Sequence, residues 1–145
     1  MTITLSDEQY RRLVVLTMLG EWMVNATQKE PDANYEYAAS QLYSFAKGTP
    51  AEKLVSLDPE TRMWVPSADS DEEIHALIDD YDDKMFWEDL TTRMAERDLL
   101  AERGERAVNG MRPAERVRMI QSYAKPYVDE FEERGLDRLV VAEDD

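Results

Sequence analysis

Residues 6–26 read SDEQYRRLVVLTMLGEWMVNA, and this stretch decides the fold class. Ser6 and Gln9 have the spacing of a capping box, in which each side chain satisfies a backbone N–H at the start of a helix. After the cap, residues recur at helical spacing on two faces, the first formed by Tyr10, Leu13, Val14, Thr17 and Val24 and the second by Leu16, Leu19, Met23 and Ala26. A helix that is apolar on so many sides is typical of the centre of a bundle, or of a helix shared with another subunit.

Further helical segments follow the first. Residues 31–46 begin with Pro-Asp and then show apolar residues at helical spacing, and Gly48 is a suitable stop. Thr49 and Glu52 predict a capped short helix over 49–55. The segment Asp58-Pro59-Glu60 is typical of a turn.

The third long helix is predicted to begin at Ser70, with Glu73 completing another capping box. Its apolar face changes direction along the helix, which predicts a bend or break near residues 82–83. The helix ends at Gly104 or is interrupted there. The last main helix starts at Pro113.

A proline and two β-like segments interrupt this helical pattern. Pro126 lies inside the last helix and predicts a kink or break, because proline removes one backbone hydrogen bond at a cost of about 3 kcal/mol. Two short β-like segments, 62–65 and 138–142, predict a minor two-stranded ribbon. The expected fold is therefore all-α: one domain over residues 1–145, a bundle of about five helices with this ribbon.

Composition restricts the function. The 145 residues include 32 acids, 17 Lys and Arg, one histidine and no cysteine, with a formal net charge of -15. A chain without cysteine has no disulfides, no thiolate nucleophiles and no Cys-ligated zinc, and it fits a reducing compartment. No signal peptide or membrane-length apolar run is visible. We therefore expect a cytoplasmic protein that binds neither membranes nor nucleic acid directly.

Acidic residues concentrate in one segment. No Lys or Arg occurs between Asp69 and Asp83, and the first basic residue is Lys84. Acids near the start of a helix are favourable, but those further along are not explained in this way. They either form a surface for a basic partner or belong to a general adaptation to salt and solubility. Together with the adjacent aromatic residues they form the predicted protein-binding site: Asp79, Asp80, Tyr81, Asp83, Phe86 and Trp87.

Chemical motifs are weak. Glu72 and His75 have the spacing of an iron-binding pair in a helical bundle, but no second histidine exists to complete such a site in one chain. Glu102-x-x-Glu105 and Glu130-x-x-Glu133 share one spacing with Mg²⁺-dependent all-α nucleotide pyrophosphohydrolases. Gly104 interrupts the first pair, and no Glu-x-x-Asp pair follows. We predict no catalytic residue, cofactor or metal.

Three functions remain open. The preferred hypothesis is a non-catalytic protein–protein interaction module with a protein partner, which could be basic, and with a homo-oligomeric state. The first alternative is an inhibitor that imitates nucleic acid and blocks a DNA-binding protein, because carboxylates can occupy a site built for phosphates. The second alternative is the Mg²⁺-dependent pyrophosphohydrolase.

Overall fold

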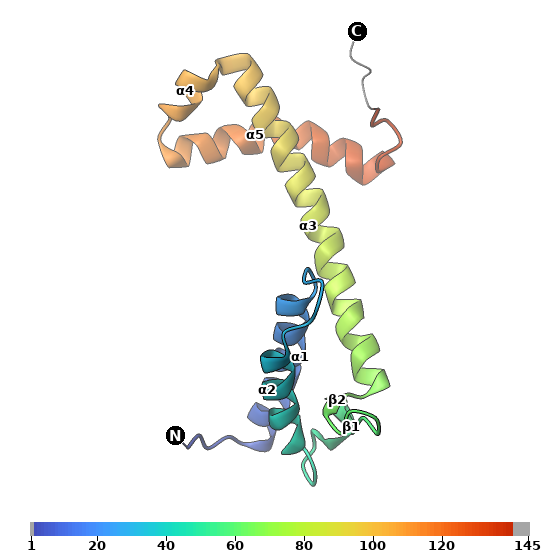
Figure 1. Ribbon diagram of the computed structural model, residues 1–145. Helices are drawn as coiled ribbons and strands as arrows, with labels where there is room; N and C mark the ends of the chain where they lie inside the picture. Colours follow the sequence, from blue (N-terminus) through green and yellow to red (C-terminus); the bar gives the residue numbers. More distant parts are fainter. Residues whose placement is uncertain (1, 141–145) are drawn as a thin grey trace. The chain divides into compact units, whose positions relative to one another are not determined.

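The computed structural model describes residues 2–140, and α-helix dominates it. In chain order the elements are α1 (Asp7–Asn25), α2 (Ala33–Ser44), the 3-10 helix η1 (Glu52–Leu54), β1 (Val55–Leu57), β2 (Trp64–Pro66), α3 (Ala68–Arg103), α4 (Glu105–Asn109) and α5 (Pro113–Arg134) (Figure 1). The chain divides into two compact units, residues 1–79 and 80–145. The all-α class with a small two-stranded sheet is confirmed, whereas the single domain stays a prediction.

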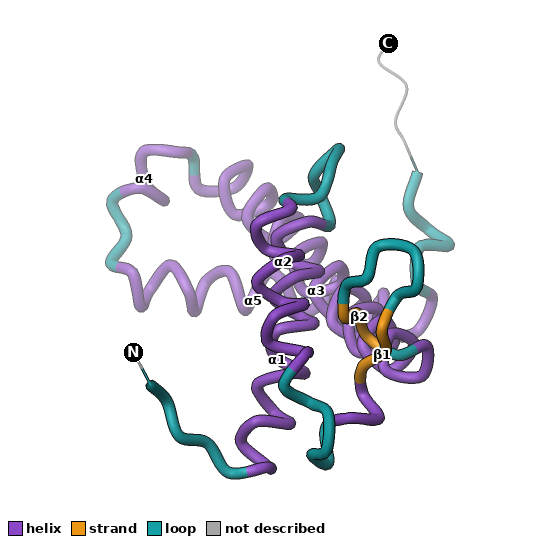
Figure 2. Tube along the Cα trace, turned by 60° about the horizontal axis from the view of Figure 1, so that its bottom comes forward, coloured by secondary structure: helices purple, strands orange, loops and turns teal. Residues whose placement is uncertain are grey.

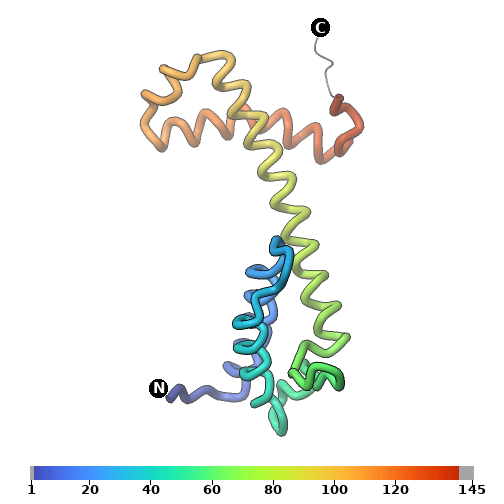
Figure 3. The backbone as a smooth tube through the Cα atoms, in the orientation of Figure 1, coloured from blue at the N-terminus to red at the C-terminus, as the bar shows by residue number. Residues whose placement is uncertain are grey.

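The first unit is built on α1 and α2, which lie side by side (Figure 3). The capping box predicted at Ser6 and Gln9 is present at the start of α1. The hydroxyl of Tyr10 donates to the carbonyl oxygen of Leu42 at 2.7 Å and joins the two helices. The core gathers side chains from α1, α2, the ribbon region and the first turns of α3: Val14, Met18, Ala39, Tyr43, Ala46, Ala51, Leu54, Val55, Ile74 and Ile78.

The ribbon pairs β1 with β2 in antiparallel register (Figure 2). Its turn contains Asp58, whose carboxylate accepts hydrogen bonds from the Thr61 hydroxyl and the Glu60 amide. These bonds lower the pKa of Asp58 and confirm the predicted turn. Ser40 anchors the ribbon to α2, because its Oγ accepts from the Trp64 amide at 2.8 Å.

The predicted pairing of the strand over 62–65 is wrong. The strand expected over 62–65 overlaps β2, but β2 pairs with Val55–Leu57 and not with 138–142. Residues 138–140 are not in a strand, and 141–142 lie outside the described residues. A hairpin closed by a short turn costs less chain entropy than a pairing between distant segments.

Two predictions about α3 also need correction. The helix begins at Ala68, and the Ser67 Oγ accepts from the Ser70 amide, so Ser67 and not Ser70 lies at the cap. Of the bend or break predicted near residues 82–83, the break is wrong, because the helix continues through these residues.

The second unit consists of α3 from residue 80 onward, α4 and α5. Gly104 separates α3 from α4 with φ of +77°, a value that side chains disfavour. Pro113 occupies the first turn of α5 as predicted, and α5 continues through Pro126 to Arg134. Among the described residues of this unit, 80–140, four are buried, namely Thr91, Ala95, Leu99 and Val108, and α5 contributes none of them.

Leu99 provides a test of this core. Its side chain is 1% exposed, whereas its neighbour Leu100 is 40% exposed. We expect Leu99→Ala to lower the free energy of unfolding by roughly 2–5 kcal/mol, because it removes apolar contacts and leaves a cavity. The matched control Leu100→Ala should cost less than about 1 kcal/mol. Urea denaturation measures both, and equal losses would contradict the described packing.

Candidate protein-binding surface

The residues predicted for the site all lie on α3, but not in one unit. Asp79 is the last residue of the first unit, and the others belong to the second. All except Trp87 are exposed, and the exposed fraction of Tyr81 is 55%. The hollows near Phe86 and Trp87 are lined only by residues of the second unit.

Trp87 makes the aromatic contact between α3 and α5. Its ring centroid lies 5.6 Å from that of Phe131 on α5 and 5.0 Å from that of Phe86. A Cβ atom placed on Gly135, just after α5, would come within 4.0 Å of the indole. Phe86, by contrast, is 49% exposed. On α3, Trp87 therefore packs against α5, whereas the adjacent Phe86 is about half exposed to solvent.

A groove of about 400 Å³ follows the line between α3 and α5. Its apolar floor comes from Trp87, Val128 and Phe131, with Thr91 beside them. Its rim carries charges, from Asp83, Lys84, Glu88 and Glu132. The groove thus combines aromatic anchors with a polar edge, the arrangement found at protein interfaces.

A second hollow of about 570 Å³ lies along α3 itself. Met85, Phe86 and Leu90 supply its apolar part. Its charged residues are Asp82, Glu88, Asp89 and Arg93. Because Glu88 lines both hollows, they are neighbours on the surface of the second unit, and we call them together the α3–α5 surface.

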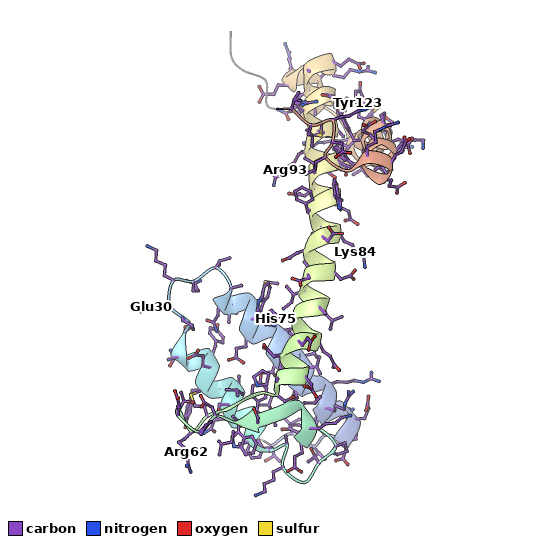
Figure 4. All side chains as sticks on the ribbon, turned by 90° about the vertical axis from the view of Figure 1, so that its right-hand side faces the viewer. Glu30, Arg62, His75, Lys84, Arg93 and Tyr123 are labelled. Carbon is purple, nitrogen blue, oxygen red and sulfur yellow. The ribbon has the colours of Figure 1, made fainter. Side chains whose placement is uncertain are left out.

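The basic residues of the α3–α5 surface are already bound to acids. Lys84 Nζ lies 2.7 Å from Asp80 Oδ2, and this hydrogen bond, with the nearby charge, raises the pKa of Lys84. Arg93 Nε lies 2.8 Å from Asp89 Oδ2. Lys84 and Arg93 both project from α3 in Figure 4.

The rim acids of the groove are not neutralised in the same way. Within residues 2–140, no salt bridge involves Asp83, Glu88 or Glu132. The α3–α5 surface is therefore apolar at its floor and negative at its edge.

Polar contacts hold α5 on α3 further along. The Tyr127 hydroxyl donates to Asp98 and accepts from Arg97, and the bond to Asp98 raises the pKa of Tyr127. Arg116 lies 3.3 Å from Glu96. These contacts join the two helices outside the groove, and none of the residues that make them lines it.

A further cavity of about 240 Å³, which the sequence analysis did not predict, lies in the first unit. Met18, Trp22 and Ile74 form its apolar wall, and Glu21, Glu36, Asp71 and His75 contribute polar groups. Glu21 Oε2 accepts a hydrogen bond from the Tyr43 hydroxyl at 3.0 Å. A signal was present, because Glu21 is the only acid between Tyr10 and Ala26.

The Glu21–Tyr43 pair is electrostatically unusual. Burial raises the pKa of Glu21, the bond from Tyr43 lowers it, and the charge of Glu36 raises it, with a net rise. Burial also raises the pKa of Tyr43, and the Glu21 carboxylate adds to the rise. The cost of burying Glu21 is therefore only partly offset by its hydrogen bond.

His75 lies on α3 at the edge of this cavity (Figure 4). Its Nδ1 is 2.8 Å from the Asp71 carbonyl oxygen, a spacing that favours the tautomer protonated at Nδ1. Its side chain is 52% exposed. Among residues 2–140, no group of three or more histidine and acidic side chains is arranged to hold a metal ion.

Comparison of the chain with models of protein families, with curated proteins and with solved structures finds no match. In the part of the chain that the structure describes, no helix combines the length and the apolar character needed to cross a bilayer.

The half-buried carboxyl of Glu21 predicts a pH effect. Because its pKa is raised above the ordinary 4.5 on folding, the folded state holds this proton more tightly, and stability falls as the pH rises through the two pKa values. Glu21→Gln keeps an acceptor for Tyr43 and removes the half-buried charge. We expect its melting temperature to exceed that of the wild type at neutral pH and to depend less on pH.

Calorimetry from about pH 4, below the ordinary pKa of 4.5, to about pH 7 measures this effect. The exposed substitution Glu30→Gln removes the same charge and serves as the control for the overall net charge. A melting temperature that rises equally in both variants would contradict a special role for Glu21.

Proposed function

We propose that this protein is a non-catalytic protein–protein interaction module and that it binds its partner through the α3–α5 surface. The observation that carries the proposal is the pair of hollows in which Phe86, Trp87, Val128 and Phe131 meet water. Apolar side chains exposed together, with a polar rim, are typical of binding sites, whereas singly exposed ones are ordinary.

The burial pattern of α5 supports this proposal. A helix of Pro113–Arg134 with no fully buried residue obtains little packing energy from its own unit. Val128, which lines the groove, is 37% exposed. A partner that covers this helix would add the apolar contacts that the unit lacks.

Other expectations stay predictions. These are the homo-oligomeric state, the cytoplasmic location, and the two alternative functions as a nucleic-acid mimic and a Mg²⁺-dependent pyrophosphohydrolase. Light scattering measures the first, since a dimer would have twice the chain mass of 16.8 kDa.

Phe86 provides the test of the proposed function. We expect Phe86→Ser to reduce the recovery of the partner by about tenfold or more, because exposed aromatic residues at the centre of an interface supply much of its binding energy. The measurement is affinity capture from an extract of the source cells, quantified by mass spectrometry.

The matched control is Phe45→Ser, which alters a phenylalanine of the first unit that is 69% exposed. It should leave the captured proteins unchanged. Partners retained at full yield by Phe86→Ser would contradict the proposal, provided that circular dichroism shows both variants folded.

A further inference from the structure

We infer that the groove between α3 and α5 binds the apolar face of a basic amphipathic helix from a different protein. This inference rests on the proposed function, since it names the chemistry of the partner at the same surface. Three properties of the groove lead to it: its shape, its charge, and its poor match to a second copy of the chain.

The shape favours anchoring side chains on a helix. The volume of about 400 Å³ lies near the lower end of the range of roughly 300–1,000 Å³ for binding pockets, so the groove has room for a few side chains and not for a whole helix. Its floor is continuous across two helices, from Trp87 and Thr91 on α3 to Val128 and Phe131 on α5. An amphipathic helix presents apolar side chains in such a row, one turn apart.

The charge selects a basic partner. Asp83, Glu88 and Glu132 edge the groove, and the one basic residue of the rim, Lys84, is bound to Asp80 at 2.7 Å. Lys or Arg residues that flank the apolar face of a partner helix would meet these carboxylates. The net charge of -15 would also speed the approach of a basic partner.

A second copy of the chain fits this groove poorly. Two grooves facing each other would bring the same carboxylates together, which is unfavourable. The arginine-rich segment around residues 103–118 is an unsuitable occupant because three of its five arginines, Arg103, Arg112 and Arg116, are paired with acids. Arg103 lies 3.2 Å from Glu102, and Arg116 lies 3.3 Å from Glu96.

The test uses the full-length protein and synthetic peptides of about five helical turns. One peptide has leucine on one face and lysine on the other. A second has the same composition in scrambled order, and two further amphipathic peptides carry glutamate or glutamine in place of lysine. Titration calorimetry gives affinities. The NMR signal of the Trp87 indole N–H, assigned by comparison with Trp87→Phe, reports whether the groove is occupied.

We expect the leucine–lysine peptide to bind and to shift the Trp87 signal, and the scrambled peptide to bind at least tenfold more weakly. Val128→Gln should weaken binding about tenfold, whereas Val117→Gln, which alters a more exposed valine on the same helix, should not. Neither valine is fully buried, so both variants should fold.

The rim is tested by charge. Asp83→Asn combined with Glu132→Gln should weaken binding by about two- to fivefold for each carboxylate removed. Asp129→Asn removes an acid of α5 that does not line the groove and is paired with Lys125, and it should have a smaller effect. The difference between the two should shrink as NaCl rises from about 0.05 M to about 0.5 M.

Each other outcome has a defined meaning. Preferential binding of the glutamate or glutamine peptide, with the Trp87 shift, would overturn the basic partner while leaving the proposed function intact. Binding of no peptide, or binding that Val128→Gln does not affect, would overturn the inference. A dimer that Val128→Gln dissociates would overturn it in favour of a second copy. The capture experiment with Phe86→Ser decides the proposed function independently.

Discussion

Two long helical segments and one short helix must cover all the apolar side chains of the second unit, and they do not suffice. Two packed helices bury only one stripe of each other, so the remaining apolar surface stays in contact with water. Only four of the residues described in this unit are buried. The contact between Trp87 and Phe131 joins the two helices, and the groove between α3 and α5 depends on it.

Acidic side chains make the edge of this apolar groove negatively charged. For the proposed partner helix, the carboxylates of Asp83, Glu88 and Glu132 would disfavour acidic sequences, whereas a groove with a neutral rim would accept many amphipathic ones. Lys84 does not reverse this preference because its ammonium group forms a salt bridge with Asp80. Exposed ion pairs contribute little to stability. Their effect here is on the electrostatic potential that a partner meets.

Much of the local structure could be predicted from the sequence because it depends on neighbours along the chain. The cap at Ser6 and the turn at Asp58 involve residues three positions apart or fewer. The predicted break in α3 was wrong because the change in apolar face has a cause that the local sequence does not show. Ile78 is buried in the first unit and Leu99 in the second, so the apolar pattern changes phase because each part of the helix belongs to a different core, while the backbone continues.

The sequence by itself determined the helical class, most helix starts and the acidity of the surface, since periodicity, capping and net charge need no knowledge of distant contacts. It also pointed to Phe86 and Trp87. Only the tertiary structure decided that Trp87 packs on α5 and lines a groove there, and that Glu21 is half-buried and bonded to Tyr43, 22 residues away. Burial and hydrogen bonding between distant segments depend on which faces pack together, and the pattern of one helix does not specify its partner.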